Sequence, residues 1–324
     1  MTPGAFDAAL GPGREFDRIR AMAARWRERA HGLGDDCAFL DTGGGRIAVS
    51  VDLSIEGVHF RRDWLAPAEI GYRAAAAALS DLAAVAAEPM ALLLSLGIPA
   101  EESEETALAI ADGVGDAVAD AGAVVVGGDL SRSDRIVIAC CVIGRSPAEV
   151  RRRGARPGDR LVVTGAFGGP LAALTAWRAG AEPASEARAR FARPAPRHAA
   201  ARFLAAHRAH AMIDVSDGLA SDLGHLLAAS GVGARLELER IPVLAVAAAE
   251  AARLGEPTWS FAARSGEEYE LLAALPPDVS DAELAHAPAA VTLIGWVEAE
   301  PGVRATANGA PAMLPAGWDH FAQG

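Results

Sequence analysis

Apolar and polar positions along the first half of the chain alternate between a strand-like and a helix-like pattern. Short apolar runs predict strands at residues 46–52, 90–98, 123–129 and 135–144. Between them, residues 68–88 and 101–122 have the composition and periodicity of helices, the first stopped by Pro89 and the second by Gly122. Strands interspersed with helices predict a sheet that is covered by helices.

The second half repeats this alternation. Strands are predicted at 160–165, 211–215, 233–243, 267–275 and 290–297, and helices at 168–179, 196–210 and 218–230. The polar, turn-rich stretch RRRGARPGD at 151–159 lies between the halves. We therefore expect two domains of the α/β and α+β classes: residues 1–150 form a sheet-and-helix domain and residues 151–324 an α+β domain.

Composition narrows the class of protein. The chain has 324 residues, 51% of them hydrophobic, which is enough for two ordinary cores. Its formal net charge of −12 argues against a general nucleic-acid surface. The longest charge-free run, 161–177, is interrupted by Gly-Gly-Pro and is too short for a comfortable bilayer span. We expect no nucleic-acid partner and no membrane association.

The cysteines and the N-terminal stretch bear on the compartment. Cys37, Cys140 and Cys141 have neither disulfide nor zinc-site spacing, so buried reduced thiols are expected. The first twenty residues lack the apolar core of a signal peptide. Both observations predict a cytoplasmic protein.

All 30 basic residues are arginine, because the sequence contains no lysine. A phosphate-binding loop of the G-x-x-x-x-G-K-[ST] type is therefore excluded, as is Schiff-base chemistry on lysine. If the protein handles nucleotide phosphates, arginines and metal ions must supply the positive charge.

Carboxylates recur beside glycines and at predicted strand ends. The clusters are Asp35–Asp36, Ser50–Asp52, Asp129 after Gly127–Gly128, Asp214–Asp217 and Glu267–Glu268, and Asp81 lies inside the alanine-rich helix. Turns and helix caps are the structural alternative for Asp36, Asp129 and Asp217. Asp81 is harder to explain in this way, because an aspartate among alanines and leucines needs a neutralising partner. Like charges in one cleft also need cations among them, and oxygen ligands of this kind suit Mg²⁺. The pattern favours a phosphate site with several Mg²⁺ ions.

In this order, the clusters resemble the thiamine-monophosphate kinases. The resemblance covers nearly the whole chain through GDDCAFL, VSVDLSIEGVHF, ALSDLAAVAAEP, GGDLSRS, GARPGDRLVVTG, IDVSDGLASDLGHL, SGEEYELL, LIGW and GWDHF. It implies ATP-dependent phosphorylation of thiamine monophosphate to the diphosphate, in an enzyme that dimerises through its N-terminal sheet. The N-terminal domain, residues 1–150, would also bind ATP and Mg²⁺.

The resemblance also implies roles for individual residues. Metal ligands would be Asp36, Ser50, Val51, Asp52, Asp81, Asp129, Asp214 and Asp217, with Val51 offering only its carbonyl where the family usually has threonine. ATP contacts would be Gly128, Asp129, Arg152 and Ser216, with Arg153 as the alternative to Arg152. His59, Glu267 and Trp318 would line the thiamine pocket.

The phosphate of thiamine monophosphate is already ionised near neutral pH, so no general base is expected and the transfer should be direct and in line. Two alternatives stay open. One is another ATP-using enzyme of the same superfamily, such as a selenophosphate or aminoimidazole ribonucleotide synthetase. The other is a catalytically silent nucleotide-binding protein.

Overall fold

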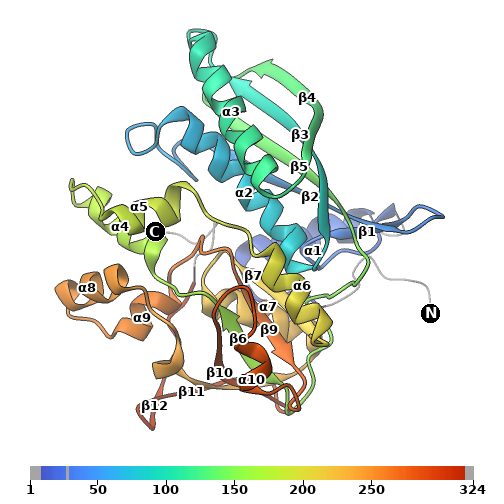
Figure 1. The fold of residues 1–324 in the computed structure, drawn as a ribbon, viewed down its shortest axis with the longest axis vertical. Helices are drawn as coiled ribbons and strands as arrows, with labels where there is room; N and C mark the ends of the chain where they lie inside the picture. The colour runs from blue at the N-terminus through green and yellow to red at the C-terminus, as the bar shows by residue number, and fades with distance from the viewer. Residues whose placement is uncertain (1–8, 27–28, 318–324) are drawn as a thin grey trace.

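Two β-sheets, each accompanied by helices, make up the chain (Figure 1). The computed structural model describes residues 9–26 and 29–317. The first sheet uses strands between residues 38 and 145 and the second uses strands between residues 160 and 312, so the expected boundary near residue 150 lies between the two sheets. The predicted two-domain class with α/β and α+β elements is confirmed.

The first sheet has the strand order β1-β2-β5-β3-β4. Its strands are β1 (Ala38–Asp41), β2 (Arg46–Ile55), β3 (Glu88–Ile98), β4 (Val124–Arg132) and β5 (Val137–Arg145). Only the β3–β4 pair is parallel, and α3 (Glu104–Asp120) forms the crossover between these two strands. The predicted strands and helices of this half all have counterparts, whereas the short β1 was not anticipated.

One face of this sheet is covered by α2 (Pro67–Ala84) and by α3. The two helices approach so closely that a Cβ at Gly71 would lie 1.9 Å from the Ile110 carbonyl oxygen, and one at Gly113 would lie 1.9 Å from that of Ala68. The small residues of α2 permit this contact, and 14 of its 18 residues are buried. The alanine-rich stretch is therefore the central helix of the domain core.

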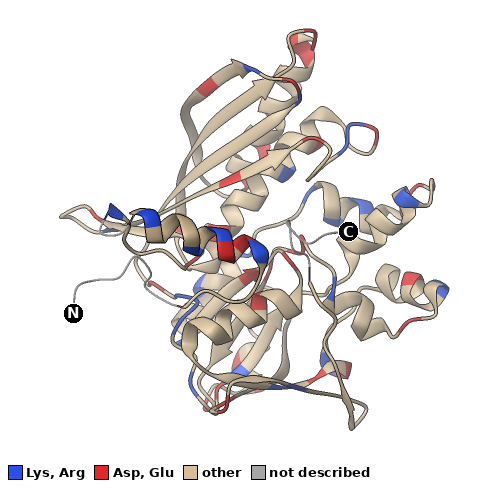
Figure 2. Cartoon of the chain, turned by 180° about the vertical axis from the view of Figure 1, so that it is seen from behind, with Lys and Arg blue, Asp and Glu red and all other residues tan. Residues whose placement is uncertain are grey.

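No helix of the described residues covers the opposite face of the first sheet (Figure 1). Val51 on β2 and Val124 on β4 are 68% and 59% exposed there. Strand pairing aligns Val51 with Cys141, and every second residue along these strands shares this face. Figure 2 shows that the strands of this sheet carry few charged residues. We call this surface the open face.

The second sheet has the order β12-β11-β8-β10-β6-β9-β7. Its strands are β6 (Arg160–Thr164), β7 (Ala211–Val215), β8 (Gly233–Glu237), β9 (Glu270–Leu275), β10 (Val291–Glu298), β11 (Gly302–Ala307) and β12 (Ala310–Ala312). The accompanying helices are α4 (Gly169–Arg178), α5 (Ser185–Ala192), α6 (His198–Ala206), α7 (Leu219–Ser230), α8 (Ala245–Leu254), α9 (Thr258–Ala263) and α10 (Asp281–Leu284). Every strand predicted in this half is present, although the one expected over 233–243 is strand only to residue 237.

The two halves pack on each other through helices. Trp177 of α4 and Phe191 of α5 belong to the same apolar cluster as the residues of α2, although they follow the predicted boundary. Helix α1 (Arg14–Trp26) lies on the second half instead, where the ring of Phe16 is 4.0 Å from that of His225. Within residues 9–26 and 29–317, no helix is long and apolar enough to cross a membrane.

A buried ionic network fastens α5 to the second sheet. Glu270 is fully buried and accepts hydrogen bonds from Thr164 Oγ1 at 2.7 Å, Arg197 Nε at 2.7 Å and Arg190 Nη2 at 2.8 Å. Glu268 accepts one from the Gly168 amide at 2.5 Å. Burial raises the pKa of Glu268 to about 7, although Arg190 opposes the change. Ionisation of Glu268 near neutral pH therefore destabilises the folded chain.

We expect Glu268→Gln to flatten part of the pH dependence of stability. A carboxyl whose pKa is higher in the folded chain stabilises below the unfolded value of 4.5, and this contribution is lost as the pH rises to about 7. The loss amounts to about 3 kcal/mol for such a shift. Denaturant unfolding of both proteins at pH 5 and pH 8 measures it. The gap between their free energies of unfolding should move in favour of the variant at pH 8; an equal gap at both values would contradict the assignment.

Candidate functional site

Three aspartates from distant parts of the chain meet where the two halves join. Asp36 precedes β1, Asp81 lies on α2 and Asp214 lies on β7, and each offers a carboxylate oxygen within 4.8 Å of the other two. Two of the aspartates accept a hydrogen bond from a serine: Ser50 Oγ donates to Asp81 at 2.5 Å, and Ser80 Oγ donates to Asp214 at 2.5 Å. We call these three aspartates the carboxylate trio.

The trio is electrostatically unfavourable without a cation. Burial and the charges of Asp214, Asp36 and Asp52 raise the pKa of Asp81 well above its usual range. Burial, together with Asp36, raises the pKa of Asp214 to about 7. Two unit charges 4 Å apart repel by about 4 kcal/mol at the effective dielectric near a protein surface. Protons or cations must therefore be present for these carboxylates to remain together.

One carboxylate oxygen of the trio is available to bind a cation. Oδ2 of Asp36 is buried and has no hydrogen-bond partner among the described residues. Buried carboxylate oxygens are normally hydrogen-bonded, and an orphan requires an explanation. A hard cation with carboxylate and serine oxygens around it provides one, so the donor set fits Mg²⁺.

Arg152 supplies the fixed positive charge beside the trio. Its guanidinium donates to Asp36 Oδ1 from Nε at 3.1 Å and from Nη2 at 2.5 Å, and its amide donates to Asp35 Oδ1 at 3.3 Å. Arg153 is exposed. Of the two alternatives, the structure brings Arg152 to the carboxylates. Burial, with the charge of Asp36 next, raises the pKa of Asp35 to about 7.

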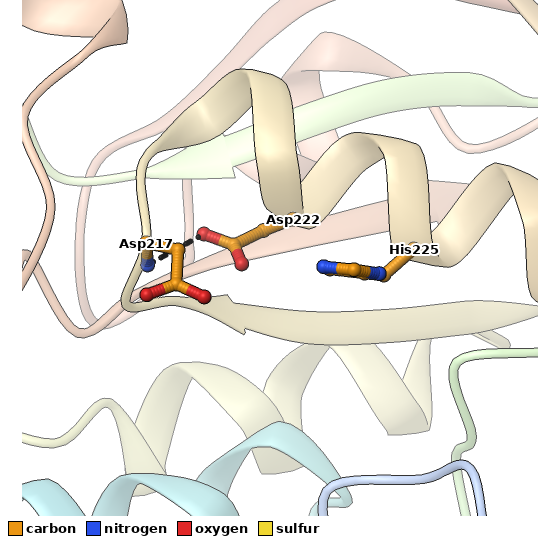
Figure 3. A group of neighbouring side chains, drawn as sticks. All are labelled: Asp217, Asp222 and His225. Carbon is orange, nitrogen blue, oxygen red and sulfur yellow. Dashed lines mark hydrogen bonds between the residues drawn. The ribbon is translucent and has the colours of Figure 1, made fainter. Parts of the chain in front are cut away.

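Asp217 joins a second group of side chains. Figure 3 shows Asp217 with Asp222 and His225, whose ligand atoms lie within 4.8 Å of one another. Asp222 on α7 accepts hydrogen bonds from the amides of Ser216 and Asp217, both at 3.1 Å, and so shapes the loop that carries them. Burial raises the pKa of Asp222 well above its usual range and lowers that of His225 to about 4.

Two other predicted ligands are separated from the trio within one chain. Asp129 pairs with Ser95 on β3, which puts its side chain on the open face, whereas Ser50 and Asp81 meet on the helix-covered face. Its strand is also three positions from β2, about 14 Å at ordinary strand spacing. The side chain of Val51 likewise lies on the open face. The expectation that Asp129 joins the cluster is therefore not met within a single chain.

Gly128 is required by packing between strands. A Cβ there would lie 1.6 Å from the Leu94 carbonyl oxygen on β3. This contact explains the glycine without a ligand, because any side chain would separate β3 from β4.

A cleft of about 930 Å³ extends from the trio across the junction of the halves. Asp52, Asp81 and Asp214 line one part of it, and Ser216 and Asp217 lie beside them. Asp52 is near enough to raise the pKa of both Asp81 and Asp214. Four of the eight predicted metal ligands thus line one cleft.

His59 and Glu267 line the same cleft. Nδ1 of His59 accepts the Ile55 amide at 3.1 Å, so a neutral ring carries its proton on Nε2. Glu267 forms an ion pair with the buried Arg73 of α2, and its backbone has a positive φ of 59°. Its amide donates to the Ser216 carbonyl at 2.6 Å, which holds this strained loop against the end of β7.

Arg73 was not anticipated, although its signal resembles that of Asp81. Both are charged residues in an alanine-rich helix, and they are two turns apart with Ala77 between them. All three belong to one side of α2, and Ala77 and Asp81 line the cleft directly. Trp318, predicted for the thiamine pocket, lies outside the described residues.

Sequence comparison places both halves in known families. Residues 34–146 match the N-terminal domain of the AIR synthase related proteins, and residues 156–308 match their C-terminal domain. The thiamine-monophosphate kinase of Mycobacterium tuberculosis is 35% identical over 297 residues, which cover 90% of this chain and 86% of that protein.

Solved structures agree in fold over nearly the whole chain. The structure described as AaThiL complexed with AMPPCP and TMP superposes with a TM-score of 0.86 at 29% identity, covering 95% of this chain and 97% of that one. The thiamine monophosphate kinase of Aquifex aeolicus gives 0.81 at 27% identity, covering 92% and 98%.

We expect Asp81→Asn to weaken divalent-cation binding while the fold is retained. The change removes one negative charge from the trio and keeps the shape of the side chain, so metal affinity falls at least tenfold, about 1.4 kcal/mol. Calorimetric titration with Mg²⁺ measures the affinity and circular dichroism checks the fold. Asp278→Asn, at an exposed carboxylate paired with Arg208, is the matched control. Unchanged Mg²⁺ affinity in Asp81→Asn would show that Asp81 has a purely structural role.

Proposed function

This chain belongs to the thiamine-monophosphate kinase family and is a kinase, and we propose that it phosphorylates thiamine monophosphate to thiamine diphosphate with ATP. The observation that carries the proposal is the carboxylate trio with its orphaned Asp36 oxygen, two members of which line a cleft of about 930 Å³. Relatives of that name share about a third of its residues across most of its length.

The proposed reaction is a direct transfer between two phosphates. An oxygen of the thiamine monophosphate phosphate forms a bond to the γ-phosphorus of ATP, the bond from that phosphorus to the β,γ-bridging oxygen breaks, and ADP leaves with the electron pair. The attacking oxygen is ionised near neutral pH, so no protein base has to remove a proton. No phosphorylated side chain intervenes.

Bringing two polyanions together is the main difficulty of such a reaction. Asp36, Asp81 and Asp214, with Asp52 and Ser50 beside them, would hold Mg²⁺ ions, which screen the repulsion between the phosphates. Asp217 and the carbonyl of Val51 remain further proposed ligands, whereas Asp129, on the open face, would contribute only at a boundary between two copies. Alignment of donor and acceptor of this kind contributes about 7–11 kcal/mol to lowering a barrier.

The protein groups around the trio would orient the two substrates. Arg152 and Ser216 are the proposed contacts to ATP, as are Gly128 and Asp129. His59 and Glu267 would line the acceptor pocket, with Glu267 held in position by its ion pair with Arg73. Trp318 remains a predicted member of that pocket.

A product assay tests the proposal and separates the alternatives. With Mg²⁺, ATP and thiamine monophosphate, we expect thiamine diphosphate and ADP in equal amounts, detected by chromatography. Consumption of ATP without thiamine diphosphate, seen only with selenide or an aminoimidazole precursor, would instead identify a synthetase of the superfamily. Binding of Mg-ATP without turnover with any acceptor would identify a silent nucleotide-binding protein.

We also propose that two copies associate through the open face. Its exposed side chains include Val51, Leu53 and Val124, and contiguous apolar surfaces of this kind commonly mark protein interfaces. Asp129 lies on this face, so the association would bring it to the boundary between the copies.

The free thiols Cys37, Cys140 and Cys141 support a reducing compartment, the cytoplasm.

Val124→Asp should convert the dimer to monomers, because it places a charge in a face that association would bury. Its matched control is Leu108→Asp on α3, since Leu108 is 57% exposed and Val124 is 59% exposed. Sedimentation or light scattering at several concentrations gives the mass. A wild-type monomer throughout, or equal dimerisation of both variants, would contradict this use of the open face.

A further inference from the structure

An aromatic cluster forms part of the wall of the cleft. Trp64, in the loop before α2, stacks on Trp177 of α4 with ring centres 5.2 Å apart and planes 5° from parallel. Trp177 in turn meets Phe191 of α5 edge to face at 5.3 Å. All three rings line the cleft that holds Asp81 and Asp214. Because Trp177 and Phe191 are buried, this wall has a rigid backing.

Trp64 is the half-buried member of the cluster, and an arginine side chain already lies over its ring. The guanidinium carbon of Arg61 lies over its ring, 4.8 Å from the ring centre. Arg61 is itself exposed, and it also donates two hydrogen bonds to Asp63, at 2.9 and 2.6 Å. An exposed arginine of this kind exchanges easily with solvent and contributes little to stability. The ring is therefore an occupied but displaceable cation–π position.

The charge of the surrounding wall suits a positively charged guest. Acidic side chains outnumber basic ones in the lining of the cleft by seven to three, and Asp63 and Glu267 are among the acidic ones. A cationic heteroaromatic ring would gain a stacking partner from Trp64 and a favourable field from the excess of acidic side chains in the lining. Its attached phosphate could then extend toward the aspartate end of the same space.

We propose that Trp64, backed by Trp177, is the binding position for the cationic ring of the acceptor, and that the Arg61 guanidinium occupies this position until the acceptor displaces it. The proposal rests on the proposed function for the identity of the acceptor. In this proposal Trp64 recognises the charge and the aromatic ring of the acceptor, and the carboxylates take part in the transfer step. Trp64 is thus a specificity-determining residue.

Replacement of Trp64 tests this assignment. Trp64→Leu should raise the KM for thiamine monophosphate about 2- to 30-fold, the range of a cation–π contact, and Trp64→Phe should restore part of the loss. The kcat and the KM for ATP should stay within about twofold, because the lost contact contributes equally to ground and transition states. An unchanged KM for thiamine monophosphate in a folded Trp64→Leu protein would overturn the proposal.

Trp296 provides a matched control. It lies on β10 with the guanidinium of Arg235 4.3 Å from its ring centre, so it repeats the tryptophan–arginine contact outside the residues that line the cleft. Trp296→Leu should leave both KM values unchanged. An equal rise in KM for Trp296→Leu and Trp64→Leu would show a general loss of packing and would overturn the proposal.

Arg61→Gln tests displacement and keeps every ring in place. Removal of the resident guanidinium should lower the KM for thiamine monophosphate, because the acceptor no longer competes with it. A higher KM would mean that Arg61 itself holds the acceptor, and would overturn the displacement.

Calorimetric binding of thiamine, which lacks the phosphate, separates this proposal from the proposed function. If wild-type protein forms no thiamine diphosphate but binds thiamine, and Trp64→Leu weakens that binding, only the proposed function fails. If the wild type phosphorylates thiamine monophosphate but Trp64→Leu binds thiamine as tightly as the wild type, only the role of Trp64 fails.

Discussion

The structure depends on keeping three mutually repelling carboxylates within 4.8 Å of one another. In water, Asp36, Asp81 and Asp214 would separate or be screened; here, burial strengthens their repulsion and raises the pKa of Asp81 and Asp214. Arg152 offsets part of this charge through Asp36. The negative charge that Arg152 does not offset favours cation binding, because the carboxylates that repel one another would all attract a divalent ion. Packing elsewhere has to hold the carboxylates in place against this repulsion.

Helix α2 does much of this holding. Its alanines and Gly71 allow it to lie directly against α3 and the first sheet, and it also packs against elements of the second half. Arg73 and Asp81 on its cleft-facing side are separated by about 12 Å, given the helical rise per residue. One rigid element therefore fixes both the partner of Glu267 and a member of the trio. A shift of α2 would disturb both ends of the cleft together.

The sequence predicted these features to different extents, for physical reasons. Strand and helix periodicity located most elements, because burial on one face leaves a regular pattern. Asp81 could be singled out because a carboxylate in an alanine-rich helix needs a partner. Asp129 illustrates the limit: a strand ending at this residue was predicted, but β4 continues to Arg132, and the face of the Asp129 side chain depends on pairing with Ser95. Trp64 and Trp177 are over a hundred residues apart, and an isolated tryptophan reads as an ordinary core residue.

The absence of lysine from the sequence is consistent with this division of the cleft. A lysine ammonium is a compact point charge, whereas a guanidinium is planar and pairs with phosphates and also with carboxylates and ring faces. Arg152, Arg73 and Arg61 do the latter here, binding Asp36, Glu267 and the Trp64 ring respectively. These arginines are thus engaged with the walls of the cleft and arrange its negative and aromatic groups. With these three arginines paired to carboxylates and a ring, cations held by the trio would supply much of the charge that neutralises phosphate.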